Sequence, residues 1–233
     1  MNIEMMIAAL PKQYGQISVD YFEELINVIQ FAQYTHPRVT AIRVDLHCPA
    51  SLLNNDMPCM ALIDRHDKIT RFFKSLRAKL SALSLKKHKA GLRHYPHNLH
   101  YVWGREQCTS ESPHYHILLL LNKDAFYHLG DYTSPDSLAG LIIQAWASAW
   151  GLHARMEGYG ENLALFAKAV HFPSNGTYYL NVNSPVAQYE RDWMKLVRRV
   201  GYLAKVASKD IQSGWRSFGS SLTTRNRKPG RTF

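Results

Sequence analysis

His114-Tyr115-His116-Ile117-Leu118-Leu119-Leu120-Leu121 is the stretch that decides the fold, because it combines a buried β-strand pattern with two potential metal ligands. Successive side chains of a strand alternate between the two faces of its sheet. His114 and His116 therefore share one face, whereas Tyr115 and Ile117 lie on the other. Two imidazoles on one face are half of a metal site. The alternative, two ordinary strand histidines, has to be weighed against the rest of the chain.

The residues before this stretch predict a hairpin partner for it. Leu99 to Gln107 has the composition of a second strand, and a short loop, Cys108 to Ser112, separates the two. A hairpin centred on Ser110 places Glu106 directly opposite His114, with facing Cβ atoms about 5 Å apart. Two imidazoles and a carboxylate leave coordination positions open, which a cation needs if it is to bind a substrate oxygen.

The identity of the third ligand depends on this register. A shift of one residue would turn Glu106 to the opposite face, and His100 or Glu111 would then take its place. Taken alone, Glu106 would be an ordinary strand carboxylate paired with Arg43 or Arg105. The sequence favours Glu106 and leaves these alternatives open.

Hydrophobic periodicity predicts further elements around the hairpin. Alternating apolar and polar residues predict a strand over Val39 to His47. Asn-Gly in Ser174-Asn175-Gly176, between the apolar segments Leu165 to Phe172 and Tyr178 to Val182, predicts a second hairpin. Apolar residues at helical spacing predict helices over Val19 to Thr35, Asp64 to Leu83, Pro135 to Trp150 and Pro185 to Ser208.

Strands grouped as hairpins, with helices between them, indicate an α+β fold: a central antiparallel sheet of about five strands with flanking helices. A chain of 233 residues is long enough for one sizeable core with extensions and too short for two large domains. We expect the core domain over residues 37–210, a helical extension over residues 1–36, and a basic, flexible tail over residues 211–233.

The chain is basic, with 28 Lys and Arg against 18 Asp and Glu and a formal net charge of +10. This excess favours a polyanionic partner, and nucleic acid is the natural candidate. The alternative is a basic protein whose charge serves solubility alone.

Cysteine use and hydropathy indicate the compartment. Cys48, Cys59 and Cys108 form no Cys-x-x-Cys pair, which argues for a reducing environment. Met1 to Leu10 lacks the basic start of a secretory leader, and no apolar run reaches bilayer-spanning length. We expect a cytoplasmic protein that has no membrane partner.

A second motif, Tyr202-Leu203-Ala204-Lys205, stands near the C-terminus and is the only Tyr-x-x-Lys among 13 tyrosines. Residues three apart on a helix share a face, so the Tyr202 hydroxyl and the Lys205 ammonium can address one phosphate. A phenol with a pKa of about 10 is a poor nucleophile at neutral pH unless a cation or a base assists it. Taken alone, Tyr202 would be an amphipathic residue at the edge of the core.

Together these features resemble the HUH endonuclease superfamily of rolling-circle replication initiators, relaxases and single-tyrosine transposases. The chain is most similar to the inovirus, or filamentous phage, replication-protein family, which includes prophage-encoded members. The segments that carry the resemblance follow the expected order across residues 40–206: Arg43-Val44-Asp45-Leu46-His47, Trp103-Gly104-Arg105-Glu106-Gln107, Pro113-His114-Tyr115-His116-Ile117-Leu118-Leu119, His171-Phe172-Pro173 and Tyr202-Leu203-Ala204-Lys205.

This resemblance implies an enzyme that nicks and rejoins single-stranded DNA at a specific sequence or hairpin. Tyr202 would be the single catalytic tyrosine, leaving a 5′-phosphotyrosyl enzyme and a free 3′-hydroxyl, and Lys205 would assist at the phosphate. His114, His116 and Glu106 would hold Mg²⁺ or Mn²⁺. Rejoining would need no nucleotide cofactor, because the covalent bond keeps the energy of the phosphodiester.

The expected partner is single-stranded or melted DNA at the replication origin of a phage or prophage element. A host helicase would unwind the duplex, because the chain has no Gly-x-x-x-x-Gly-Lys-Ser/Thr loop. Two alternatives remain: a catalytically degenerate prophage DNA-binding protein, and another metal-dependent phosphodiesterase that uses the two histidines. The basic residues expected to contact DNA are Lys86, Lys87, Lys89, Arg93, Arg198 and Arg199.

Overall fold

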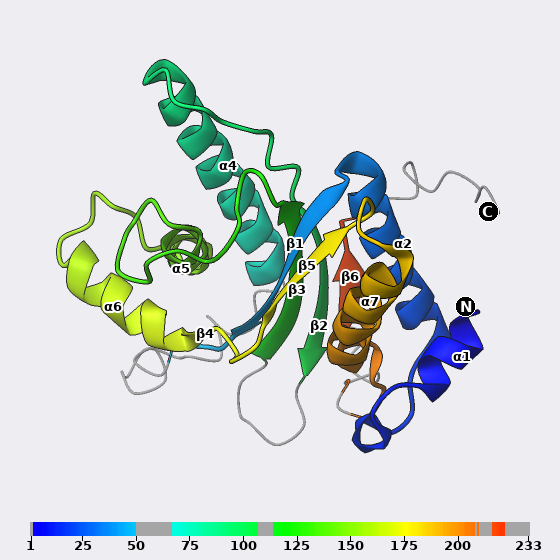
Figure 1. The fold of residues 1–233 in the computed structure, drawn as a ribbon. Helices are drawn as coiled ribbons and strands as arrows, with labels where there is room; N and C mark the ends of the chain where they lie inside the picture. The colour runs from blue at the N-terminus through cyan, green and yellow to red at the C-terminus, as the bar shows by residue number, and fades with distance from the viewer. Residues whose placement is uncertain (1, 50–66, 107–113, 208, 210–215, 222–233) are drawn as a thin grey trace.

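The computed structural model of the protein describes residues 2–49, 67–106, 114–207, 209 and 216–221. An antiparallel sheet stands between two layers of helices (Figure 1). The predicted α+β class, with a central antiparallel sheet of about five strands, is confirmed. The strand order is β4 (Val170–His171), β1 (Arg38–Leu46), β3 (His114–Asn122), β2 (His100–Glu106) and β6 (Phe218–Ser220), and β5 (Thr177–Asn181) also pairs with β1.

Helices cover both faces of this sheet. One face packs against α4 and α5, and the other against α2 and α7. In the described part of the chain, none of the helices is both long and apolar enough to cross a membrane. The helices are α1 (Ile3–Ala8), α2 (Val19–Thr35), α4 (Lys68–Lys89), α5 (Leu138–Ala149), α6 (Tyr159–Ala169) and α7 (Val186–Val200), with 3₁₀ turns η1 (Lys12–Tyr14) and η3 (Gly201–Ala204).

The central strand β3 is apolar at consecutive positions because both of its faces are buried. Ile117 and Leu119 contact the α4 and α5 layer, whereas Leu118 and Leu120 contact the α2 and α7 layer. Each of these four side chains is fully buried. A strand covered on one face only would alternate apolar and polar residues instead. The burial of β3 fixes its register, because a slip of one residue would exchange the two faces.

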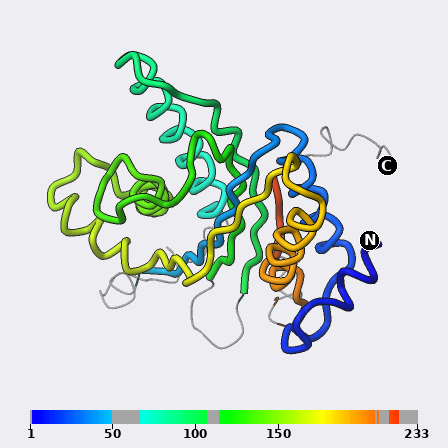
Figure 2. Tube along the Cα trace, viewed as in Figure 1, coloured from blue at the N-terminus to red at the C-terminus, as the bar shows by residue number. Residues whose placement is uncertain are grey.

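The Asn-Gly segment does not form the predicted hairpin. β4 and β5 both pair with β1, one after the other along the same edge (Figure 2). Residues 172–176 bulge out between them, with Gly176 N donating to Pro173 O at 3.0 Å. A Cβ at Gly176 would lie 2.7 Å from that oxygen, so the turn requires glycine. The prediction was wrong because Asn-Gly favours a tight turn and does not specify which strand its flanks pair with.

The segment before this turn, Leu165 to Phe172, is mostly helical rather than the predicted strand. α6 continues to Ala169, and only two residues follow in β4. Phe166 and Ala169, three residues apart, are buried on one face of α6. A short apolar run fits both helical and strand periods, and here packing against α5 selects the helix.

Two segments expected outside the core domain contribute to its packing. α2, in the expected N-terminal extension, has Phe22 and Leu25 fully buried against the sheet. Within the expected tail, β6 pairs with β2, and Phe218 stacks on Tyr21 of α2 with ring centroids 4.4 Å apart. Three apolar or small residues within a Ser- and Arg-rich segment give no detectable strand pattern. Residues 211–215 and 222–233 of the expected tail lie outside the described residues.

Candidate functional site

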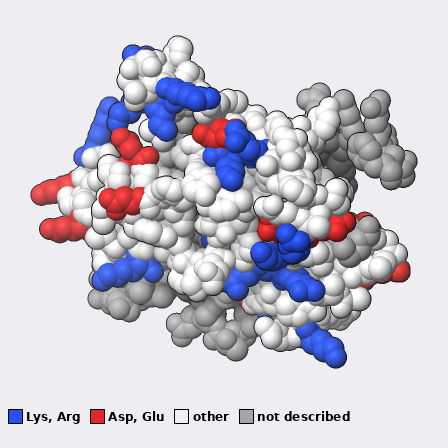
Figure 3. All heavy atoms as spheres, in the orientation of Figure 1, with Lys and Arg blue, Asp and Glu red and all other residues white. Residues whose placement is uncertain are grey.

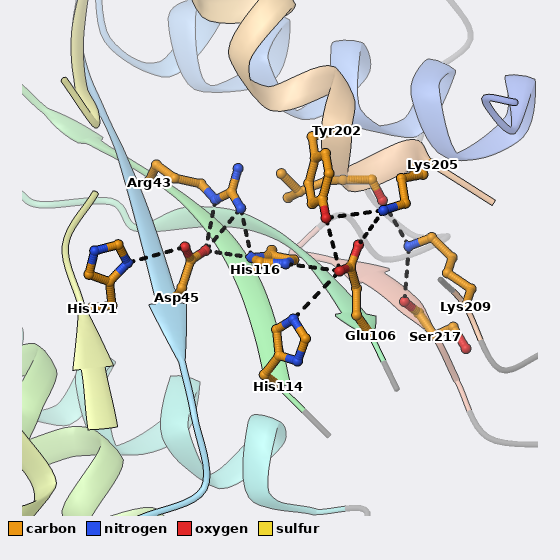
Figure 4. A network of polar contacts seen from close by, with 11 residues as sticks. Arg43, Asp45, Glu106, His114, His116, His171, Tyr202, Lys205, Lys209 and Ser217 are labelled. Atoms are coloured by element: carbon orange, nitrogen blue, oxygen red, sulfur yellow. Dashed lines mark hydrogen bonds and ion pairs between the residues drawn. The ribbon is translucent and has the colours of Figure 1, made fainter. Parts of the chain in front are cut away.

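The hairpin register is the one predicted from the sequence. Glu106 of β2 pairs directly with His114 of β3, and His116 pairs with Asp45 of β1. His114, His116 and Glu106 each offer a ligand atom, and these atoms lie within 4.8 Å of one another. Glu106 Oε2 is 3.5 Å from His114 Nε2 and 3.2 Å from His116 Nε2 (Figure 4). This half-buried group could hold a metal ion.

Asp45 orients the His116 ring from the neighbouring strand. Asp45 Oδ1 lies 2.6 Å from His116 Nδ1 and accepts a hydrogen bond from Arg43 Nε at 3.0 Å. Arg43 Nη2 also lies 2.7 Å from the same His116 nitrogen. One nitrogen cannot accept from Arg43 and donate to Asp45 at once. We assign its proton to the Asp45 contact, which is shorter and ends on a carboxylate. Histidine ligands of metals commonly have such a partner.

The other ring nitrogen of His116 faces the remaining two ligands. Nε2 is buried and faces Glu106 Oε2 at 3.2 Å, and it has no hydrogen bond of normal geometry with any of the described residues. A buried nitrogen in this state is costly unless another group satisfies it. A cation between the three ligand atoms would do so, and mixed imidazole and carboxylate ligands suit a divalent ion. The residues present therefore fit a metal centre.

Without a cation, the two carboxylates of this region act on the protonation of His116. Burial alone would raise the pKa of Asp45, but hydrogen bonds from His116 and Arg43 hold it well below its usual value. Burial alone would lower the pKa of His116, but the contacts with Asp45 and Glu106 raise it. The carboxylates thus favour a positive charge at the position where a cation would stand.

Tyr202 and Lys205 reach this group from the α2 and α7 layer (Figure 4). Tyr202 Oη donates to Glu106 Oε2 at 3.0 Å, and Lys205 Nζ donates to the Tyr202 oxygen at 3.1 Å. Burial raises the pKa of Tyr202, Lys205 opposes this shift, and the charge of Glu106 adds to it. The structure therefore brings together the five residues predicted for the catalytic and metal-binding roles.

The helix predicted to carry Tyr202 ends just before it. α7 stops at Val200, Tyr202 lies in the 3₁₀ turn η3, and Lys205 follows directly. Residues three apart eclipse one another in a 3₁₀ turn, which brings Lys205 over Tyr202 more closely than an α-helix would. The turn approaches the sheet above Gly104, where a Cβ would lie 3.1 Å from Leu203 O. Gly104 therefore makes room for the turn.

The segment before α2 also holds η3 in place. Ser18 N donates to Ala204 O at 2.9 Å, and Ile17 forms an isolated β-bridge with Lys205. Because these contacts are made by backbone groups, they fix the path of the turn independently of the side chains that reach the site.

Sequence reasoning missed Lys209. Its Nζ donates to Leu203 O at 2.8 Å and to Ser217 O at 3.3 Å, so it connects η3 with the segment that leads into β6. Burial lowers the pKa of Lys209 to about 8. No motif marks this residue, because it is a single lysine whose two acceptors are main-chain atoms.

Two further histidines, His47 and His171, lie next to the site. The His47 ring stacks on His114 with centroids 5.4 Å apart, and His171 Nδ1 lies 3.6 Å from Asp45 Oδ2. Burial lowers the pKa of His47, and the nearby His114 contributes to the same shift. Both belong to segments that carried the family resemblance, but spacing alone had not linked them to the metal ligands.

The register excludes His100, one of the two alternatives for the third ligand. His100 pairs with Leu120, four residues along β3 from His116, and its ring meets Phe31 of α2 edge-on at 5.2 Å. Burial lowers the pKa of His100 to about 4. Four strand residues correspond to about 13 Å, so His100 cannot share a cation with His116. Glu111 lies outside the described residues.

The basic residues predicted to contact DNA fall into two groups. One lies at the far end of α4, which Figure 1 shows at the opposite end of the sheet from the ends of β2 and β3 that carry Glu106 and His114. The other lies in the last turn of α7, directly before η3. The first group is Lys86, Lys87, Lys89 and Arg93, and the second is Arg198 and Arg199.

Known relatives cover almost the whole chain. The uncharacterized protein YagK of Escherichia coli (strain K12) is 38% identical over 208 residues, which are 89% of this chain and 95% of that protein. The uncharacterized protein YfjJ of the same organism is 34% identical over 215 residues, 90% of this chain and 97% of that protein. No solved structure matches the chain. The family model described as YagK/YfjJ C-terminal domain matches residues 2–221, and the chain belongs to this family.

Proposed function

We propose that this protein is a metal-dependent enzyme that nicks and rejoins single-stranded DNA through a phosphotyrosyl intermediate. One observation carries the proposal: the Tyr202 hydroxyl lies 3.0 Å from the same Glu106 oxygen that His114 and His116 approach at 3.5 and 3.2 Å. A nucleophile within hydrogen-bond distance of a metal-binding group is the arrangement that phosphoryl transfer to a phenol requires.

A divalent cation, Mg²⁺ or Mn²⁺, held by Glu106, His114 and His116 would neutralise charge on the scissile phosphate and fix its position. Tyr202 would then attack the phosphorus. The new bond joins the Tyr202 oxygen to phosphorus, and the bond that breaks is the one to the 3′-oxygen, which leaves and takes up a proton. The products are a 5′-phosphotyrosyl enzyme and a free 3′-hydroxyl, and the reverse reaction rejoins the strand.

The side chains around the Tyr202 hydroxyl suit this step. Glu106 Oε2 accepts its hydrogen bond, so the phenol proton has an acceptor. Lys205 Nζ donates to the phenol oxygen at 3.1 Å and so stabilises negative charge that develops on it. The described residues would fill three of the coordination positions of a divalent ion, which leaves room for phosphate oxygens.

The biological setting follows from the family resemblance. The matching segments and their order support a role in starting rolling-circle replication of a phage or prophage element, with a host helicase as partner. Within this proposal Arg43 and Asp45, from the first of these segments, contact His116 Nδ1, and His171, from another, contacts Asp45.

The test is to trap the covalent intermediate. The purified chain is mixed with Mn²⁺ and labelled single-stranded oligonucleotides from the origin region of the element that encodes it. We expect a labelled protein–DNA adduct that survives denaturation, and peptide mass spectrometry should place the nucleotide on Tyr202. Metal-dependent cleavage without an adduct would instead support a hydrolytic phosphodiesterase. Binding without cleavage under any metal would support a DNA-binding protein that has lost its activity.

Asp45→Asn should weaken metal binding without removing a ligand. The neutral amide cannot hold His116 Nδ1–H as a carboxylate does, and it leaves Arg43 without its ion pair. Loss of such a partner typically costs 10- to 100-fold in metal affinity, and we expect this range for Mn²⁺ measured by titration calorimetry.

Asp192→Asn is the matched control for Asp45→Asn, because Asp192 lies on α7 and pairs with Lys195 at 3.6 Å, without a contact to His116. Its Mn²⁺ affinity should stay within about twofold of the unsubstituted protein. Equal affinities for both variants would show that Asp45 does not orient a metal ligand.

A further inference from the structure

A groove lined by both polar and apolar residues lies at the far end of α4, away from the Tyr202 site. It has a volume of about 450 Å³ and lies between the C-terminal half of α4 and residues 94–98. A smaller hollow of about 30 Å³ adjoins it and adds Lys87, Arg93 and Tyr95. We call the two together the α4 groove. Its polar lining is Ser81, Ser84, His88, His94, His97 and Asn98.

The net positive charge of the chain lies in the segment that includes the α4 groove, and Lys87 and Arg93 of this segment line the groove itself. Residues 68–105 contain ten Lys and Arg and no Asp or Glu. The rest of the chain therefore holds 18 Lys and Arg against 18 Asp and Glu and is balanced, so this segment accounts for the whole net charge of +10. Figure 3 shows Lys and Arg side chains gathered over the tip of α4 at the top of the view. Such a concentration favours a polyanion at this place.

Basic side chains in the α4 groove lie over aromatic rings. Arg93 is 5.0 Å from the centre of the Tyr95 ring, and Lys87 is 5.9 Å from that of Phe126. Asp124, an acidic residue at the margin of the smaller hollow, is paired with Arg38 at 2.7 Å. The aromatic rings therefore hold the Lys87 and Arg93 side chains at the groove, and the Asp124 carboxylate is already paired with Arg38.

The helix dipole alone does not account for this composition. Lysines in the last turn of α4 offset the partial negative charge at its C-terminus. Arg93, His94 and His97 come after the helix, and Ser81 and Ser84 come before its last turn. These residues add hydrogen-bonding side chains on both sides of the groove. Compensation of the helix dipole does not require them, whereas phosphate binding uses such groups.

The α4 groove and the candidate active site lie at opposite ends of β3. Pro96 O and His97 O both accept hydrogen bonds from Asn122, the last residue of β3, whereas His114 is its first. Eight strand residues span about 26 Å. This length corresponds to about eight base pairs of duplex DNA at 3.4 Å each.

We infer that the α4 groove binds the phosphate backbone of DNA on one side of the cleavage site, so that the protein holds its substrate at two points. The inference rests on the proposed function in taking DNA as the polyanion. Phosphate contacts from Lys87 and Arg93 would position the flanking DNA and leave the choice of the cleaved bond to the Tyr202 site.

The experiment measures DNA affinity without catalysis. Lys87→Gln and Arg93→Gln are combined in the full chain carrying Tyr202→Phe, in EDTA, and binding is followed by fluorescence anisotropy. The probes are a duplex and a single strand of about 30 nucleotides, well beyond the ~8 base pairs of separation. We expect the double substitution to weaken binding about tenfold at low salt and to lower the salt slope by roughly two.

The control removes the same two charges elsewhere, as Arg155→Gln with Lys168→Gln, both exposed and near α6. It should change affinity less than about twofold. Equal losses in the two double variants, or no loss in either, would overturn the inference. A loss limited to one probe identifies duplex or single-stranded DNA as the form bound. The measurement uses neither a divalent cation nor the Tyr202 hydroxyl, so the affinities can be interpreted even if the protein does not nick DNA. Equal melting temperatures of the variants exclude misfolding as the cause of a loss.

Discussion

Tyr202→Phe should reduce DNA cleavage by roughly 10⁴-fold or more and abolish the covalent protein–DNA adduct. The substitution removes only the oxygen that would bond to phosphorus and keeps the ring, which stands edge-on to His116 at 5.1 Å. The lost oxygen also ends the hydrogen bonds with Glu106 and Lys205. The measurement is the initial cleavage rate of a labelled single-stranded oligonucleotide in Mn²⁺, with adducts separated on a denaturing gel.

Tyr189→Phe is the matched control for this substitution. Tyr189 lies on α7, and its hydroxyl donates to Gln33 at 2.9 Å, away from the metal-binding group. Its cleavage rate should stay within about twofold of the unsubstituted protein. An adduct that persists in Tyr202→Phe and disappears in Tyr189→Phe would show that Tyr189 of α7 is the nucleophile and that Tyr202 is not.

The central hairpin of this site could be predicted because its geometry is local. Alternation places His114 and His116 on one face, and a loop centred on Ser110 fixes which residue of β2 lies opposite. The observed pairing of Glu106 with His114 follows from these two rules. Burial of β3 on both faces then leaves no alternative register, so local and tertiary preferences agree.

Contacts between distant segments could not be predicted in the same way. Asp45 meets His116 because β1 pairs with β3 in one particular register, and no turn connects these strands to specify it. The same holds for β6, whose three residues pair with β2 while Phe218 stacks on Tyr21 of α2. Such pairings depend on the fully packed core, which periodicity along the chain does not describe.

The Tyr202 motif shows an intermediate case. Its spacing from Lys205 predicted a shared face, and the Lys205 contact with the phenol oxygen at 3.1 Å agrees with that. The helix expected to carry both ends at Val200, because the chain turns over Gly104 into η3. The pairing of the two side chains could be predicted because both helix types bring residues three apart together.

His114→Gln and His116→Gln should each lower the Mn²⁺ affinity of the protein about 100-fold or more and reduce cleavage to a similar or greater extent. Each substitution leaves two of the three ligand atoms that now lie within 4.8 Å of one another. We expect the larger loss for His116→Gln, because it also leaves Asp45 without its 2.6 Å contact. Titration calorimetry gives the affinity, and cleavage is measured over a range of Mn²⁺ concentrations.

His153→Gln is the control for these ligand substitutions, because it makes the same change at an exposed histidine after α5. Thermal unfolding separates a metal effect from a folding effect. Mn²⁺ at about 100 times its Kd should stabilise the unsubstituted protein and His153→Gln by about 2.7 kcal/mol and raise their Tm. The ligand variants should fold in EDTA but gain little from the same Mn²⁺ concentration. If all four proteins gain equally, the ion binds elsewhere, and Glu106, His114 and His116 do not form a metal centre.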